Sequence, residues 1–222
     1  MPEMTARSAS VFLIFVMGCA AAATQGGSPL LSPHDPRFEK HAPDRSVVKL
    51  DTSKGLVRIE VTRAWAPLGA DRFINLVRHG FYDEARFFRA VKDRWIQFGI
   101  NGDPAVAKAW RYQAIQDDPF VGNSNVEGTI AFAFAVPNGR TTQVFFNMRD
   151  NSATHDKEPF VIFGKVIEGW DAVKSINTEY GDNSGGGIRA GKQDPVFNEG
   201  NAFLTREFPR LDFIKKATVE ER

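Results

Sequence analysis

The chain contains the stretch Phe87-Phe88-Arg89-Ala90-Val91, which is followed shortly by Ile96-Gln97-Phe98-Gly99. Aromatic and β-branched residues dominate both runs, and such residues favour β-strands. Arg89 and Gln97 therefore lie on two neighbouring predicted strands, eight positions apart in the sequence. Taken alone, a polar side chain at either position would be an ordinary solvated or ion-paired strand residue, so this pair needs further evidence before it marks a functional site.

Short strands are predicted on both sides of this stretch. They are expected at residues 47–50, 56–61, 87–91, 95–99, 129–135, 144–148, 160–166 and about 211–219. Two helices are predicted, at residues 67–80 and about 170–176. Pro67 opens the first helix, because the missing N–H of a proline would have no partner in a first helical turn anyway. Many short strands with two helices indicate a mainly β fold, either a closed barrel or a sandwich.

The composition argues against several classes of function. The 222 residues carry 28 basic and 27 acidic side chains, spread along the chain with a net charge of +1. Without clustered basic charge, we expect no nucleic-acid partner. The glycines of residues 181–191 lack the Gly-Lys-Ser/Thr signature of a phosphate-binding loop, and His155-Asp156 offers too few ligands for a metal site. We therefore expect neither a metal nor a cofactor.

The N-terminal residues have the features of an export signal. Residues 11–23 form an apolar run of 13 residues, too short for a bilayer that needs about 20 but suited to a secretory signal. Cys19 follows Gly18 as in a bacterial lipobox, so residues 1–23 are predicted to be a signal peptide or a lipoprotein signal, with lipid on Cys19. The alternative is cleavage within residues 20–23, which removes Cys19. Either way we expect an exported protein, periplasmic or anchored to a membrane through the lipid.

Two further segments are set apart by their composition. Residues 24–46 contain four prolines and no hydrophobic period, so we expect a flexible tether there. The folded domain is predicted over residues 47–222. Within it, residues 181–210 are expected to form a glycine-rich insertion before the last strand.

Three blocks of the sequence resemble the cyclophilins, a family of peptidyl-prolyl cis/trans isomerases. The blocks are residues 48–82, 87–104 and 128–166, in the family's order and with nearly its spacing, and the resemblance covers about residues 47–180. It implies a closed eight-stranded antiparallel barrel capped by two helices. It also implies a monomer that acts on proline-containing peptides or unfolded proteins and assists the folding of exported clients.

The same resemblance assigns the candidate site. Arg89 corresponds to the family's main catalytic residue. The positions that correspond to its substrate-binding residues are Trp95, Gln97, Ala133, Phe134, Ala135, Gln143, Phe145 and His155. An arginine suits the reaction because its guanidinium stays charged and presents several donors in a fixed fork. Beside the proline nitrogen, it can donate to the lone pair that appears as the amide twists.

Several positions depart from the family pattern. Phe88 replaces the usual histidine, Arg94-Trp95 replaces a Phe-Met pair, and Phe134 replaces an asparagine. Thr154 stands where a tryptophan supports tight cyclosporin binding, so we expect low sensitivity to that drug. The histidine that often precedes Phe-Gly-Lys corresponds here to Pro159 or Phe160. These changes leave a second hypothesis open, a catalytically weak module of the same fold that binds proline-containing segments.

Overall fold

The computed structural model describes residue 1, residues 28–185 and residues 192–220. The predicted signal segment and Cys19 lie outside the described residues. Among those that are described, no helix has the length and apolar character needed to span a membrane.

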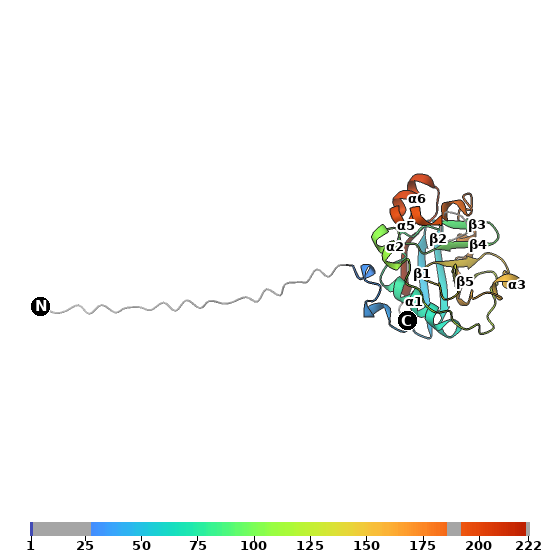
Figure 1. The fold of residues 1–222 in the computed structure, drawn as a ribbon, viewed down its shortest axis with the longest axis horizontal. Helices are drawn as coiled ribbons and strands as arrows, with labels where there is room; N and C mark the ends of the chain where they lie inside the picture. The colour runs from blue at the N-terminus through green and yellow to red at the C-terminus, as the bar shows by residue number, and fades with distance from the viewer. Residues whose placement is uncertain (2–27, 186–191, 221–222) are drawn as a thin grey trace.

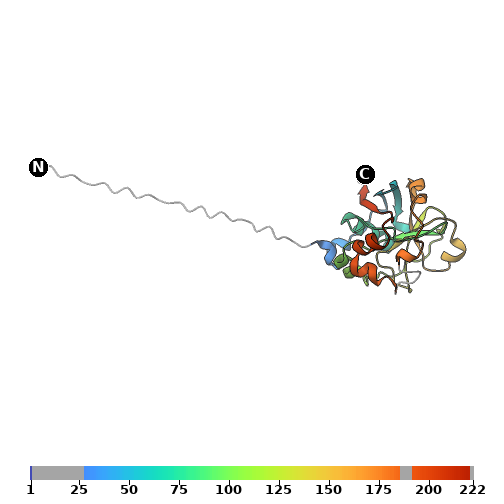
Figure 2. The same ribbon diagram turned by 90° about the horizontal axis from the view of Figure 1, so that it is seen from above.

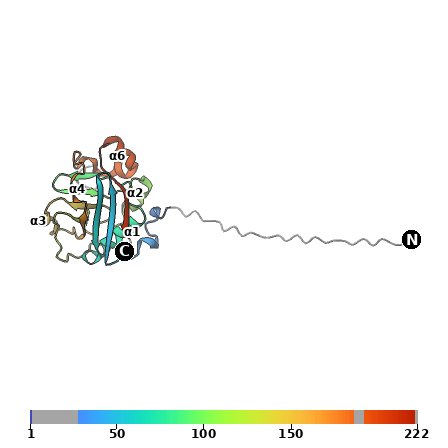
Figure 3. The same ribbon diagram turned by 180° about the vertical axis from the view of Figure 1, so that it is seen from behind.

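Eight strands form a single, wholly antiparallel sheet, as the sequence predicted. The spatial order is β3-β4-β6-β5-β7-β2-β1-β8. Figure 3 shows the long strands β1 and β2 with β8 in red beside them. The strands are β1 (Arg45–Thr52), β2 (Gly55–Thr62), β3 (Arg89–Val91), β4 (Trp95–Phe98), β5 (Thr129–Phe132), β6 (Val144–Asn147), β7 (Ile162–Glu168) and β8 (Ile214–Glu220).

The sheet is open, which corrects the prediction of a closed barrel. Its edge strands β3 and β8 do not pair as a ladder. An isolated bridge links Arg86, which precedes β3, to Phe213, which precedes β8. Strand β3 itself has only three residues, and the residue that forms a bridge with its central Ala90 is Gly181. The segment after the last predicted helix therefore occupies the edge that β8 would need for closure.

The number of helices also differs from the two that were predicted. The described residues contain six, of which α1 (Pro67–Arg78) and α4 (Trp170–Lys174) match the predictions; the others are α2 (Pro104–Trp110), α3 (Ser152–His155), α5 (Asp194–Glu199) and α6 (Asn201–Glu207). Helix α2 begins with the Asp103 side chain accepting a hydrogen bond from the Ala105 N–H at 2.8 Å, a standard N-cap. Helices α2, α5 and α6 lie together at one end of the molecule (Figures 1 and 2).

The expected insertion at residues 181–210 is therefore partly helical. Helices α5 and α6 are held by a small apolar cluster of their own. Its buried members are Phe88, Ile100, Ala107, Val196, Phe197, Leu204 and Leu211. Burial of Val196, Phe197 and Leu204 provides the hydrophobic stabilisation that short helices need to form.

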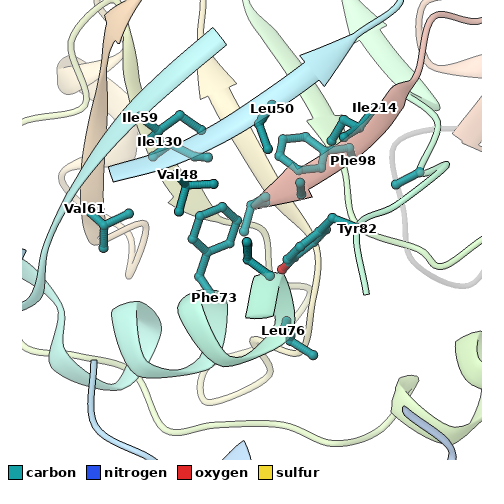
Figure 4. Packing of buried hydrophobic residues seen from close by; sticks show 14 of the residues in the cluster. Val48, Leu50, Ile59, Val61, Phe73, Leu76, Tyr82, Phe98, Ile130 and Ile214 are labelled. Atoms are coloured by element: carbon teal, nitrogen blue, oxygen red, sulfur yellow. The ribbon is translucent and has the colours of Figure 1, made fainter. Parts of the chain in front are cut away.

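The main core lies between the sheet and α1. Figure 4 shows Phe73 of α1 facing side chains from several strands, among them Val48, Ile59 and Ile130, and Leu76 belongs to the same cluster. Phe73 also contacts the rings of Tyr82 and Phe163, with centroids 5.2 and 4.9 Å apart. The two-residue period of the strands directs one face of the sheet into this core.

Residues 28–44, expected to belong to a free tether, pack against the domain. Phe38 is buried between His79 and Trp110, and the Trp110 Nε1–H donates to the Leu30 carbonyl at 2.8 Å. The Asp71 carboxylate on α1 accepts from the Ala42 N–H at 2.7 Å. These contacts are long-range, which is why composition alone suggested a tether.

Candidate active site

A row of side chains across four strands forms the floor of the site. The antiparallel register places Arg89 opposite Gln97, Gln97 opposite Phe145, and Phe145 opposite Ala131. Residues that are paired across neighbouring strands point to the same face of a sheet. The neighbouring row of paired residues points to the other face and belongs to the main core. That row consists of Ala90, Ile96, Phe146 and Ile130, so the site lies on the face opposite the core.

Side-chain amides extend from Arg89 along the site. The Arg89 Nη1–H donates to Gln97 Oε1 at 3.0 Å, and Gln97 Nε2 donates to Gln143 Oε1 at 2.8 Å. Gln143 Nε2 donates in turn to Gln193 Oε1 at 3.0 Å. Gln97 and Gln193 are each 5% exposed, so this chain satisfies polar groups that burial would otherwise penalise.

The Arg89 guanidinium has two further neighbours. Its Nε–H donates to the Asp182 carboxylate in an ion pair. Its Cζ lies 4.9 Å from the centroid of the Trp95 ring, within the range of a cation–π contact. The Arg89 side chain is 13% exposed, so the arginine is held on several sides while still reaching the surface of the site.

Aromatic rings form the apolar part of the site. The Phe145 ring meets those of His155 and Phe160 edge-on, with centroids 5.5 Å away in each case. His155 and Phe160 lie 4.6 Å apart, and Phe134 packs on Phe160 at 4.4 Å. Such a set of rings offers a flat-sided apolar pocket to a ring-shaped group.

Burial shifts the protonation equilibrium of His155. Removal of the imidazole from water lowers its pKa, an effect that the nearby Arg149 reinforces and that Asp156 and Glu158 oppose. The neutral form is therefore favoured, which keeps this wall of the pocket uncharged.

The polar and apolar parts line one pocket of about 750 Å³. All nine residues that the sequence analysis assigned to catalysis or substrate binding line it: Arg89, Trp95, Gln97, Ala133, Phe134, Ala135, Gln143, Phe145 and His155. The strand expected at residues 129–135 ends at Phe132, but the Ala133 N–H still donates to the Gln143 carbonyl at 2.9 Å. Ala133 thus keeps its place beside β6.

Other lining residues were missed. Phe160 had been noted only as the position of an absent histidine, and Gln193 and Phe197 come from the predicted glycine-rich insertion. Arg111 and Tyr112, which follow α2, also line the pocket. The ion-pair partner Asp182 carried no sequence signal, because it lies 93 positions from Arg89. Within residues 28–185 and 192–220, no three His, Cys, Asp or Glu side chains gather in a way that could hold a metal ion.

An eight-stranded antiparallel sheet with such a pocket on the face opposite its main core defines a cyclophilin-like protein. The chain belongs to the cyclophilin-type peptidyl-prolyl cis-trans isomerase family, whose model matches residues 47–196. It is 34% identical over 138 residues to a peptidyl-prolyl cis-trans isomerase of Streptomyces antibioticus, covering 59% of this chain and 82% of the relative. Over 140 residues it is 32% identical to one of Acinetobacter baylyi, covering 61% and 74% of the two chains.

Solved structures support the fold. A cyclophilin type peptidyl-prolyl cis-trans isomerase of Cryptosporidium parvum superposes with a TM-score of 0.58 at 17% sequence identity. The match covers 80% of this chain and 99% of that one.

Proposed function

We propose that this protein catalyses cis/trans isomerisation of X–Pro peptide bonds. The observation that carries the proposal is that Arg89 lines the same pocket as Phe145, with Gln97 paired between them in the sheet. The proline ring would lie against Phe145 and the neighbouring aromatic rings, and the guanidinium would face the proline nitrogen. The relatives named above, which share the family, are named as isomerases of this kind.

The chemistry requires no nucleophile. Rotation about a peptide bond has a barrier of about 18–20 kcal/mol, because resonance gives the C–N bond partial double-bond character. As the amide twists, the proline nitrogen regains its lone pair. A guanidinium that donates to this lone pair stabilises the transition state more than the planar ground state, so it raises the rate rather than only the affinity.

The alternative is a binding module without useful turnover. The Arg89–Asp182 ion pair favours that reading, since it occupies part of the guanidinium. Against it, side chains within the described residues accept hydrogen bonds only from Nε–H and from one Nη1–H of Arg89. A guanidinium has five N–H donors in all. Trp95 also lines the pocket without filling it, because a volume of about 750 Å³ remains. We therefore favour the isomerase.

The proposal is tested by the exchange rate of an Ala-Pro peptide in the presence of the full chain. Arg89→Ala is expected to lower kcat/KM by about 10²–10³-fold, the usual effect of removing one donor that acts on the transition state. Arg206→Ala is the matched control, because Arg206 is an exposed arginine on α6 that pairs with Glu199 and Glu207. A folded wild-type chain that does not accelerate exchange would contradict the isomerase and leave the binding module as the remaining hypothesis.

We further propose that the protein is bacterial and exported, and that its clients are exported proteins. Support comes from the sequence alone, from the apolar run of residues 11–23 and from Cys19. Fractionation of a Gram-negative host that expresses the full chain tests this. We expect a membrane-associated form that Cys19→Ala converts to a soluble periplasmic form; recovery in the cytoplasm would contradict export.

A further inference from the structure

The segment that follows α4 lies along the free edge of β3. Gly181 forms a bridge with Ala90, and the Ser184 hydroxyl donates to the Phe88 carbonyl. Ser184 is 1% exposed and belongs to a short 3-10 turn, η4 (Asn183–Gly185), which packs on β3. An edge strand exposes unpaired backbone groups, and this segment covers them at the strand that carries Arg89.

This docking brings Asp182 to the guanidinium. Asp182 lies between the two anchored positions, Gly181 and Ser184, so its carboxylate is held against the Arg89 Nε. The Asp182 side chain is 29% exposed. The contact therefore lies at the border of the pocket, where the surrounding protein partly shields it from water.

Three contacts together restrict the orientation of the guanidinium. Asp182 accepts from Nε, Gln97 accepts from Nη1 at 3.0 Å, and the Trp95 ring lies 4.9 Å from Cζ. No hydrogen bond joins Nη2 to a protein group within the described residues. A carboxylate on Nε therefore limits rotation about the end of a long side chain and leaves terminal donors available.

We propose that Asp182 is a positioning residue for the reaction, holding Arg89 in the orientation in which its free donors face the substrate. This inference rests on the proposed isomerase function, because it concerns how Arg89 acts. A side chain that loses rotamer freedom before the substrate binds does not need to lose it in the transition state. Asp182 is therefore expected to affect kcat rather than KM.

The experiment compares variants of the full chain in the Ala-Pro exchange assay. Asp182→Ala is expected to lower kcat about tenfold with KM changed less than twofold, and Asp182→Asn, which keeps the shape and one acceptor oxygen, is expected to lose less. Glu179→Ala is the matched control, because it removes a carboxylate from the same segment that pairs with Arg210 rather than Arg89. It should leave both constants unchanged.

A double-mutant cycle separates positioning from a general structural role. If Asp182 acts through Arg89, adding Asp182→Ala to Arg89→Ala causes no further loss. A further loss of the same size in that background, or a kcat for Asp182→Ala equal to or above that of the wild type, would overturn the inference; the latter would show that Asp182 withholds Arg89 from the substrate. Asp182→Asn decides the question if Asp182→Ala does not fold.

The two proposals fail in different ways. Wild-type protein without turnover, or Arg89→Ala with full turnover, would contradict the proposed function itself. An active wild type that loses its activity in Arg89→Ala but not in Asp182→Ala would contradict only the role of Asp182.

Discussion

The two faces of strands β4, β5 and β6 differ less in how deeply their side chains are buried than in what covers them. Phe146 is 0% exposed and Phe145 is 4% exposed, although they are neighbours in the chain. Phe146 packs in the main core, 5.6 Å from the Phe98 ring. Phe145 belongs to a separate small cluster with Ala131 and Ile162, beside the pocket.

The difference shows how one sheet supports both stability and function. On the core face, α1 closes over the strands, and the side chains contact one another on all sides. On the site face His155 of the short helix α3 packs on the Phe145 ring, a pocket of about 750 Å³ stays open, and a chain of amides from Gln97 to Gln193 satisfies the polar groups. A ligand can therefore complete the packing of the site face but cannot enter the core face.

The largest effect should come from exchanging the two phenylalanines for alanine. Phe146→Ala is expected to lower the free energy of unfolding by about 3–5 kcal/mol, because it leaves a closed cavity. Phe145→Ala should cost less, roughly 1–3 kcal/mol, because its cavity opens into the pocket. Urea denaturation measures both, and the Ala-Pro assay should show a raised KM for Phe145→Ala. Equal losses of stability would mean that the two faces are packed alike.

An intermediate effect is expected when the polar chain is cut at Gln97. Gln97→Leu keeps most of the volume but removes the hydrogen bonds to Arg89 and Gln143. We expect kcat/KM to fall about tenfold, equivalent to about 1.4 kcal/mol in the transition state.

The matched substitution on the core face is Ile96→Leu, one residue away. It should change stability by less than about 1.5 kcal/mol and leave turnover unaltered. If Ile96→Leu lost as much turnover as Gln97→Leu, the prediction that only the site face supports catalysis would be wrong.

The smallest expected effect is a pH dependence of stability that comes from His155 on the site face. Burial lowers the pKa of His155 in the folded state, while the unfolded chain has the usual value of about 6.5. The unfolded state therefore binds more protons below about pH 6.5, so the contribution of His155 is present above that pH and is lost as the pH falls. Between pH 8 and pH 5 the folded protein should therefore lose part of its stability as the imidazole gains a proton.

Thermal unfolding of the wild type and His155→Gln at both pH values checks this. The variant should lose less stability on acidification than the wild type. If both lose the same amount, the imidazole does not contribute and other groups account for the acid sensitivity.

Local features of the sequence were enough to predict the strands and the proximity of Arg89 and Gln97. Arg89 and Gln97 face each other because they are equally distant from Asp93, in the tight turn between β3 and β4, where its φ is +55°. The register of a hairpin follows from the position of its turn. The two-residue period then places Arg89 and Gln97 on the same face, so their proximity could be predicted from spacing alone.

The resemblance to the cyclophilins added residues that spacing could not connect. Phe145 lies on β6, Gln143 comes just before that strand and Ala133 just after β5, all about 50 positions from Arg89. Their place in the pocket depends on the order of strands in the sheet, which no local pattern encodes. The family pattern supplied that order, and the structure places the three in the same pocket as Arg89.

The sequence by itself determined the strands, the first helix and the Arg89–Gln97 pair, because these depend on residues close together in the chain. Only the tertiary structure decided that the sheet stays open, that residues 28–44 pack on the domain, and that Asp182 and Gln193 reach the site. The contacts that Ala42, Gln193 and Asp182 make join residues separated by 29, 50 and 93 positions. Their formation depends on how packed elements offset the entropy of closing long loops, which no local pattern of residues reveals.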